Sequence, residues 1–580
     1  MFYPYLEEMK TSRKIIDQFH GYNHNLKISD GEFYDMENMT SASYPVLSPR
    51  QKRGVYARPE NALGLIDKDA LCYIDGRDFV INGKRIDMGL SSEVPKSMVS
   101  MGAYVIIMPD KKYINTQDFT DFGNIEAQFS TTDGQSVSFG LCKPDGDSYE
   151  SYVVSSSEPL EPENNALWLD TSSDPHSLKQ WSASAGMWVT IATTYIKISA
   201  TGIGKSFEVY DGVEISGVTE KLPDLNGSFV IMGKEDDFIV VTGILDYVET
   251  QTTPVTVKRQ MPLMDFIIES GNRLWGCRYG VAHNGNVVNE IYASKLGDFK
   301  NWNCFMGIST DSYAASVGSD GMFTGAANHN GFPIFFKENC IHKIYGTQPS
   351  SYQIQNTIAR GVQQGCHKSL AIVNEILYYK TRQGICVYDG SFPVEISQQF
   401  GEERYSDAVG GGHGNKYYIS MKDSGGKPNL FVYDSQKRLW HREDATEVLD
   451  FCSSDDEMYF IDKKDGAIKT ILGSGSEQEA SVPWMVETGL IGTNSPDRKY
   501  VSRVTVRMSL DIGTEVSFFI QYDSADEWVP LLNMTGTSLR SFAIPLRPRR
   551  CDHFRLRISG EGEAKILSLA KTIETGSDVF

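Results

Sequence analysis

An aromatic strand that directly follows a tight turn recurs through the second half of this 580-residue chain. The recurring segments are GNRLWGC at 271–277, NGFPIFF at 330–336, NEILYYK at 374–380, GNKYYIS at 414–420 and DDEMYFI at 455–461. From the second segment to the fifth, equivalent positions lie about 44, 40 and 41 residues apart. A period of roughly 40–50 residues indicates small sheets that bury their faces only by stacking on their neighbours.

Each aromatic strand has short apolar partners before and after it in the sequence. The partners include DFIIES at 265–270, SLAIVN at 369–374, CIHKIYG at 340–346 and NLFVYDS at 429–435. Three or four antiparallel strands per unit predict an all-β fold, a β-propeller. Two further hairpins at 70–83 and 103–115 bring the expected number to about seven blades, although their spacing is nearer 33 residues. The alternative is a run of unrelated hairpins in a sandwich.

The repeat divides the chain into five parts. We expect an N-terminal arm and entry strand at 1–60, the first blades at 61–120, an inserted β module or modules at 121–258, the remaining blades at 259–477 and a C-terminal β-sandwich at 478–580. Alternating strands in the second half of the insertion favour a small sandwich or barrel.

The C-terminal part has strands with one apolar face and one basic face. In RVTVRMSL, Val504 and Val506 alternate with Arg503 and Arg507, and HFRLRIS at 553–559 follows the same pattern. Side chains alternate between the two faces of a strand, so one face is predicted to be core and the other solvated.

Composition limits the classes of function. The net charge of -20 argues against tight, sequence-independent binding to a phosphate backbone, which needs clustered Lys and Arg. The longest apolar runs are much shorter than the ~20 residues of a membrane-spanning helix. Nine scattered cysteines without a C-x-x-C pair predict reduced core residues and folding in a cytoplasm.

No motif predicts an enzyme, a metal site or a cofactor. ATGIGKS at 200–206 resembles the end of a phosphate-binding loop, but Ser199 replaces the first glycine and a strand follows, so a turn is expected. The ten histidines are dispersed, and a G-x-S-x-G nucleophile elbow is missing. The acidic runs at 235–237 and 455–457 fall at turns, where solvated carboxylates are common.

Three tryptophans in the insertion have two interpretations. Trp168, Trp181 and Trp188 punctuate short strands between 166 and 191. Flat aromatic faces stack on sugar rings, so the three could form a glycan platform. In a small module they could equally form the core.

The stretch PLRPRRCDHFRLR at 545–557 is the strongest basic anomaly in an acidic chain. It holds the candidate partner-facing residues Arg547, Arg549, Arg550, Arg555 and Arg557. One interpretation is a solvated sheet face, and another is docking to an acidic surface of a neighbouring subunit. Contact with DNA is the third.

The N-terminal run at 19–54 resembles the opening of a family of phage virion proteins. It reads FHGYNHNLKISDGEFYDMENMTSASYPVLSPRQKRG, and the similarity lies in a pattern of Phe, Gly and Asn, then an acidic "GE" segment, then a proline-leucine-arginine turn. Together with the blades and the C-terminal sandwich, the chain is similar to the packaged-DNA stabilisation proteins of short-tailed phages, which form the tail hub or nozzle. LWLDTSSDPHSLKQWSASAGMW at 167–188 and DGVEISG at 211–217 are also similar to modules of phage tail proteins.

The resemblance implies a mechanical role in the virion tail, after assembly in the host cytoplasm. Several copies, six by family analogy, would form a ring below the portal and its adaptors. This ring would retain packaged double-stranded DNA and pass it during genome ejection without specific binding. A receptor- or glycan-binding tail or baseplate protein is the first alternative. The second is a propeller-type glycoside hydrolase, which would need two carboxylates about 5–9 Å apart in one cleft.

Overall fold

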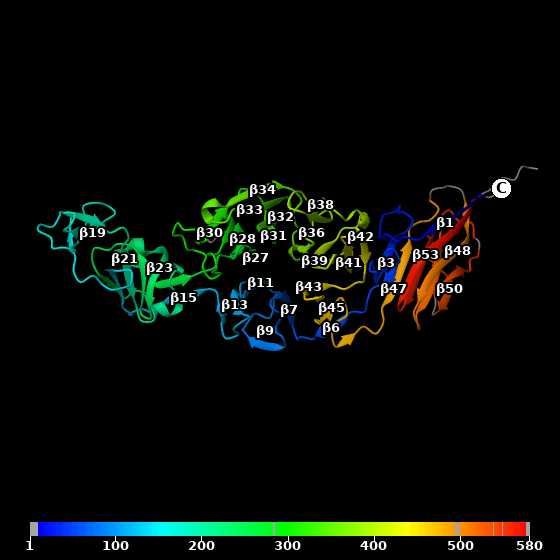
Figure 1. Ribbon diagram of the computed structural model, residues 1–580, viewed down its shortest axis with the longest axis horizontal. Helices are drawn as coiled ribbons and strands as arrows, with labels where there is room; N and C mark the ends of the chain where they lie inside the picture. The colour runs from blue at the N-terminus through cyan, green and yellow to red at the C-terminus, as the bar shows by residue number, and fades with distance from the viewer. Residues whose placement is uncertain (1–9, 282–284, 494–497, 537–538, 548, 576–580) are drawn as a thin grey trace, which may run out of the picture.

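The computed structural model describes residues 10–281, 285–493, 498–536, 539–547 and 549–575. Figure 1 shows an elongated molecule with three parts in a row: the insertion at one end, the propeller in the middle and the sandwich at the other end. In the described residues, every element other than the strands is a short 3-10 helix. They are η1 (Ile203–Ser206), η2 (Pro223–Leu225), η3 (Pro349–Ser351), η4 (His367–Ser369) and η5 (Gln398–Phe400). In this part of the chain, no helix has the length and apolar character to cross a membrane.

The described residues form seven antiparallel blades, which confirms the predicted all-β propeller. The first two blades are β7 (Ala62–Asp67), β8 (Leu71–Asp75), β9 (Asp78–Ile81), β10 (Lys84–Asp87) and β11 (Ser97–Met101), β12 (Tyr104–Met108), β13 (Lys112–Asn115), β14 (Phe122–Asn124). Blades three and four are β27 (Phe266–Glu269), β28 (Leu274–Val281), β29 (Val287–Ala293), β30 (Tyr313–Ser316) and β31 (Phe323–His329), β32 (Phe332–Lys337), β33 (Cys340–Tyr345), β34 (Gln353–Ile358). Blades five and six are β35 (Ala371–Val373), β36 (Ile376–Lys380), β37 (Ile385–Tyr388), β38 (Val394–Glu395) and β39 (Ser406–His413), β40 (Lys416–Lys422), β41 (Pro428–Asp434), β42 (Leu439–Arg442).

The recurring aromatic strands are the second strands of their blades. The turn before each of them contains residues with positive φ, such as Asn272, Asn330 and Asn374. Asn and Gly tolerate this left-handed conformation, which tight hairpins require because it matches the twist of the strands. The recurring sequence pattern therefore marks the first hairpin of each of these blades.

The seventh blade closes the ring with a strand from the N-terminal arm. It contains β43 (Val448–Ser454), β44 (Glu457–Asp462), β45 (Ile468–Thr470), β6 (Gly54–Ala57) and β46 (Glu477–Gln478). β6 lies between β45 and β46 and pairs with both. The first strand of blade seven in turn contacts the first strand of blade one, where the Ser454 hydroxyl donates to Asp67 Oδ1 at 2.6 Å.

The insertion leaves the ring between blades two and three. Its strands β15 (Ala127–Ser130), β16 (Val137–Cys142), β21 (Tyr195–Ser199), β22 (Gly212–Ser216), β23 (Gly227–Glu235), β24 (Phe238–Thr242), β25 (Glu249–Gln251) and β26 (Thr256–Arg259) form one sheet around an apolar core. β17 (Val153–Ser155), β18 (Leu167–Asp170), β19 (Ser177–Ser182) and β20 (Met187–Thr190) form a small second sheet, named here the tip sheet. The tip sheet lies at the far end of the molecule (Figure 1).

The C-terminal sandwich includes strands from both ends of the chain. One sheet has the order β1 (Lys10–Ile16), β53 (Ala564–Thr575), β48 (Lys499–Leu510), β51 (Arg540–Ile544). The other has the order β2 (Gly21–Tyr22), β3 (Glu32–Glu37), β47 (Pro483–Thr488), β52 (Phe554–Glu561), β49 (Glu515–Tyr522), β50 (Val529–Thr535). The short pair β4 (Met39–Thr40) and β5 (Ser48–Pro49) follows in the arm. The predicted alternation in β48 and β52 is confirmed, but the two strands belong to different sheets, so their arginines face different sides.

Three consecutive glycines, 410–412, let the inner strand of blade six lie close to both neighbouring blades. A Cβ at Gly411 would be 2.4 Å from Met458 Cε and 2.5 Å from Phe451 Cβ, both in blade seven. At Gly412 it would be 2.7 Å from Val373 Cγ2 in blade five. The absence of side chains at these three positions of β39 therefore sets how closely the blades pack.

We expect Gly411→Ala to lower the free energy of unfolding by about 1–3 kcal/mol, because overpacking forces neighbouring side chains out of place. Urea denaturation followed by tryptophan fluorescence measures the change. Gly318→Ala is the matched control, since a Cβ at Gly318 meets no atom within 4 Å. Equal effects of the two substitutions would contradict the packing argument.

Candidate functional site

A cluster of largely buried charges lies at the joint between propeller and sandwich. Here the arm runs from the sandwich to β6, past the segment that follows β42. Arg50 and Arg53 belong to the arm, Glu443 and Asp444 follow β42, and Glu479 follows β46. We name these five residues the joint cluster. It ties three segments that are far apart in the sequence.

Arg53 is the centre of the joint cluster. Its Nη2 lies 2.5 Å from Glu443 Oε2, and its Nη1 lies 2.8 Å from Asp444 Oδ2. Only 4% of its side chain is exposed. Arg50 Nη1 lies 2.6 Å from Glu479 Oε2, and the same oxygen accepts from the backbone N–H of Arg53 at 2.9 Å. A planar guanidinium suits this arrangement, because its donors form a fixed fork that can serve two carboxylates.

The pKa of the Asp444 carboxyl shows how strongly the joint cluster stabilises a negative charge. Burial alone would raise its pKa, but the charge of Arg53 and hydrogen bonds from Thr446 lower the pKa to about 2. Burial also opposes ionisation of Glu479, and Arg50 and the Arg53 amide lower its pKa. Both carboxylates are therefore held in the charged form at neutral pH.

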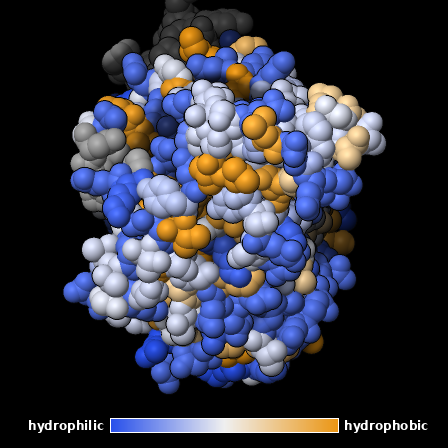
Figure 2. Space-filling model, turned by 90° about the vertical axis from the view of Figure 1, so that its left-hand side faces the viewer, coloured by the Kyte–Doolittle hydropathy of each residue, from blue (hydrophilic) through white to orange (hydrophobic). Residues whose placement is uncertain are grey.

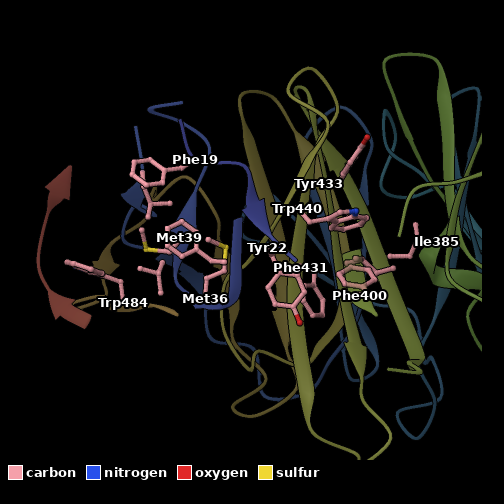
Figure 3. Close-up of a cluster of buried hydrophobic side chains, with 14 of the residues drawn as sticks. Phe19, Tyr22, Met36, Met39, Ile385, Phe400, Phe431, Tyr433, Trp440 and Trp484 are labelled. Carbon is pink, nitrogen blue, oxygen red and sulfur yellow. The ribbon is translucent and has the colours of Figure 1, made fainter. Parts of the chain in front are cut away.

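An apolar core continues through the joint beside the charges. Figure 3 shows Tyr22 of the arm between Met36 and Met39 on the sandwich side and Phe400, Phe431 and Trp440 on the propeller side. The Tyr22 ring centroid lies 5.3 Å from that of Phe431. Gly21 has φ 80°, and a Cβ there would be 2.2 Å from Trp440 O, so glycine alone fits. Sandwich and blade six thus share one continuous core.

A second buried ion pair lies inside the insertion, where it meets blade three through Asn301. Arg259 Nη1 lies 2.5 Å from Asp211 Oδ2, and both side chains are buried. Asn301, in the long connection between β29 and β30, donates to Asp211 Oδ1 at 2.9 Å and accepts from the Gly212 N–H at 2.9 Å. The hydrogen bonds of Asn301 therefore join the insertion to blade three in addition to the two chain connections.

The three candidate tryptophans gather on one face of the tip sheet. The strand register puts Trp168 opposite Lys179 and Trp181 opposite Trp188, on the face away from Leu169 and Leu178. The latter two pack toward the main sheet of the insertion. The Trp188 ring centroid lies 5.4 Å from each of the other two indoles, in edge-to-face geometry.

These indoles differ in burial and in hydrogen bonding. Trp168 is buried and donates to Ser155 O at 2.9 Å, whereas Trp181 and Trp188 are half-buried. The indole N–H of Trp188 lacks an acceptor among the described residues. Figure 2 looks at this end of the molecule, where orange apolar side chains lie between hydrophilic ones. Glycan binding by this cluster stays a prediction.

The candidate arginines are divided between a sheet face and a connecting segment. Arg555 and Arg557 point outward from β52, where Arg555 lies over Tyr34 at 4.2 Å and Arg557 lies over Trp528 at 4.0 Å. Arg557 also pairs with Glu487 of β47. The other three, Arg547, Arg549 and Arg550, are exposed in the connection from β51 to β52. Partner docking by these five residues stays a prediction.

The segment that resembles a phosphate-binding loop and the acidic run at 455–457 form hydrogen bonds within the protein. In ATGIGKS, the Gly202 N–H donates to Asp237 Oδ1 at 2.7 Å and the Gly204 N–H donates to Asp236 O at 3.0 Å. Glu457 is buried and accepts backbone N–H groups of Met458 and Leu472. In the described part of the chain, no three His, Cys, Asp or Glu residues gather in a group that could hold a metal ion.

The joint cluster was not predicted from the sequence. Its partners are 390 residues apart in the case of Arg53 and Glu443. The available signal was the pattern Arg50, Lys52, Arg53 in an acidic chain, directly after a proline turn. On its own, this segment indicates only the family resemblance.

Comparisons with known proteins place the chain in no family. No protein-family model and no curated protein matches it. Among solved structures it is similar to an exo-β-1,3-galactanase from Phanerochaete chrysosporium, at 8% identity and a TM-score of 0.20 over 53% of this chain and 94% of that one. It is also similar to Raptor from Chaetomium thermophilum (10% identity, TM-score 0.27, 73% and 30% covered) and to Trypanosoma rangeli sialidase (9%, 0.16, 90% and 95%). None of these likenesses bears on function, and the class of protein, a β-propeller protein with an inserted β domain and a β-sandwich, rests on the sheet order itself.

We expect Arg53→Ala to destabilise the protein by about 3–5 kcal/mol, because it removes the nearer counter-charge of Glu443 and Asp444 and leaves only Arg50, at 3.8 and 3.4 Å. Thermal unfolding measures the loss. Arg58→Ala, in the same arm, is the matched control, since Arg58 and its partner Glu477 are both exposed and little change is expected. A similar effect of both substitutions would contradict a special role of the joint cluster.

Stability should depend on pH through Asp444. The pKa of this carboxyl is lower in the folded state, so its contribution is complete above the ordinary value near 4 and is lost as pH falls from about 4 to about 2. Thermal midpoints of the wild type and of Asp444→Asn, measured at intervals from pH 7 to 2, test this. The variant should be less stable at pH 7 and should approach the wild type at pH 2. Parallel curves would contradict it.

Proposed function

We propose that the chain is a structural protein of a phage tail hub or nozzle. The observation that carries the proposal is that the segment with the family resemblance, 19–54, is the segment that builds the joint. It supplies Gly21 and Tyr22 to the shared core, and Arg50 and Arg53 to the joint cluster. Residues in this segment are thus used for mechanical connection, as a load-carrying virion part requires.

The architecture supports a role as one subunit of a ring. Buried ion pairs fix the arm to the propeller at one end, and hydrogen bonds from Asn301 fix the insertion to it at the other. A force on one end is therefore transmitted to the other rather than absorbed in a linker. The net charge of -20 also supports a role as a DNA channel. A negatively charged lumen repels DNA phosphates, so the polymer slides through without adhering. Six copies below the portal and its adaptors follow from the family analogy.

The test is to locate the chain in virus particles. Gold-labelled antibodies against the purified protein should bind at the tail vertex of phage particles from the same source, and electron microscopy of the protein at high concentration should show closed rings. The variant Arg53→Ala should assemble poorly, while Arg58→Ala should assemble normally. Absence of label from particles would contradict the proposal, as would a map of the assembled ring with a basic lumen.

A further inference from the structure

Lys337 is buried between blades three and four without a negatively charged partner. It is the last residue of β32, and 2% of its surface is exposed. Buried lysines are normally paired with a carboxylate, as Lys96 is with Asp110 at 2.6 Å. Among the described residues, Lys337 forms no ion pair, and both acceptors of its hydrogen bonds are uncharged. This is an unusual environment for a lysine.

The surroundings of Lys337 favour the uncharged amine. Its Nζ lies 4.6 Å from the ring centroid of Phe323 and 5.3 Å from that of Tyr279. Burial lowers the pKa of Lys337, although nearby thiols and Asp320 act in the opposite direction. The uncharged amine is a nucleophile, whereas the ammonium ion is not. At neutral pH, the reactive form is therefore more abundant than for a lysine in water.

The group in contact with this amine is the carboxamide of Asn289 in β29. Lys337 Nζ donates to Asn289 Oδ1 at 2.9 Å. Asn289 Nδ2 donates to Val317 O at 2.9 Å and to Ser319 O at 2.7 Å. Ser319 O also accepts from Lys337 Nζ at 2.8 Å. The carboxamide is thus fixed at both of its polar atoms, with Cγ next to Nζ. Holding two reacting groups together in this way replaces an encounter in solution and accelerates their reaction.

An uncharged base contacts the same residue, Ser319. His342 Nε2 lies 2.8 Å from the Ser319 hydroxyl. Burial, together with the charge of Lys337, lowers the pKa of His342 to about 4, so its imidazole is uncharged at neutral pH. The Nδ1 atom of this ring has no hydrogen-bond partner among the described residues. An uncharged imidazole beside the pair can relay a proton from an attacking amine to a leaving nitrogen.

We propose that Lys337 and Asn289 form an isopeptide bond that links blade four to blade three. Nζ of the uncharged amine attacks Cγ of the carboxamide. The Nζ–Cγ bond forms, the Cγ–Nδ2 bond breaks, and one proton passes from Nζ to Nδ2, so that ammonia leaves. No atom is oxidised or reduced, so the two side chains need no further reactant.

Other buried lysines of the chain differ in the group that they contact. Lys571 contacts Asp30, and the hydrogen bonds and charges of Lys571 and Lys14 lower the pKa of this carboxyl against the effect of burial. An ionised carboxylate is a poor electrophile. Lys380 donates to Gln363 Oε1 at 2.8 Å and is the nearest analogue of Lys337. A bond between these two residues would also release ammonia, so the experiment must locate the linked residues.

The bond would lie at the blade that receives the insertion. Asn289 belongs to blade three, as does Asn301, which forms the hydrogen bonds to the insertion. A covalent link from this blade to blade four would keep the two blades together under a force on the insertion. The inference rests on the contacts of Lys337 and Asn289, and it is independent of the proposed hub function.

The first measurement is the mass of the intact, denatured protein. We expect this mass to be lower than the value calculated from the sequence by one ammonia in most of the molecules. Digestion with trypsin then locates the bond. Because trypsin does not cleave after a modified lysine, the fragment 279–295, which contains Asn289, should be linked to the fragment 301–343, which contains Lys337.

Two variants test the assignment. Asn289→Ala removes the electrophile, so its mass should equal the value calculated from its own sequence. Asn429→Ala in blade six is the matched control. Asn429 also donates its side-chain amide to a backbone carbonyl, but among the described residues its carboxamide accepts no hydrogen bond from a lysine. This control should still lose one ammonia.

Each outcome supports or overturns the proposal. A wild-type mass equal to the calculated value overturns it. A linked fragment that joins Lys380 to Gln363, or an undiminished loss of ammonia in Asn289→Ala, overturns the placement. If Asn289→Ala does not fold, the linked fragment of the wild type decides alone. All of these measurements use the purified chain, so their failure is distinguishable from a failure to find the protein in phage tails.

Discussion

The contact of Arg53 with Glu443 and Asp444 is the interaction on which the arrangement of the whole chain depends. The arginine immediately precedes β6, the strand that completes blade seven, and its two carboxylates immediately follow β42 of blade six. The same ion pairs therefore position the closing strand of the ring and the neighbouring sandwich. Buried ion pairs add little net stability compared with apolar packing, but they strongly disfavour arrangements in which one partner is missing. Their value here lies in the specificity of the joint.

The sequence was sufficient for the blades and insufficient for the connections between the parts. Each blade begins with a hairpin whose turn contains residues such as Asn272 or Asn330, and such turns are local in the sequence. β1, β3 and β6 have no comparable local pattern, because they pair with strands more than 400 residues away. β2 pairs with the nearby β3 but has only 2 residues. The arm was therefore expected as an entry strand, and its part in the sandwich was not foreseen.

For the candidate sites, too, local features could be predicted from the sequence and long-range contacts could not. The hairpin of β19 and β20 makes Trp181 and Trp188 neighbours, which a local pattern can indicate, but the face on which they lie depends on how the tip sheet packs. In the sandwich, the sequence indicates one unusual position, Lys571 of β53. Alternation from Leu569 to Ile573 places Lys571 in phase with the core, and a charge at such a position suggests a partner or a ligand. Its opposition to Lys14 required the fold.

Closure of the ring by β6 has a consequence for the order in which the protein is made. Blades one to six and the insertion leave the ribosome while β6 has no partner, since β45 and β46 are still about 400 residues away along the chain. Until then the nascent propeller has two open edges, which are exposed strand surfaces prone to pairing with other chains. The ring can close only after β46 (Glu477–Gln478) has been made, and the sandwich only after β53 (Ala564–Thr575), so a prematurely terminated chain lacks the sandwich or both parts.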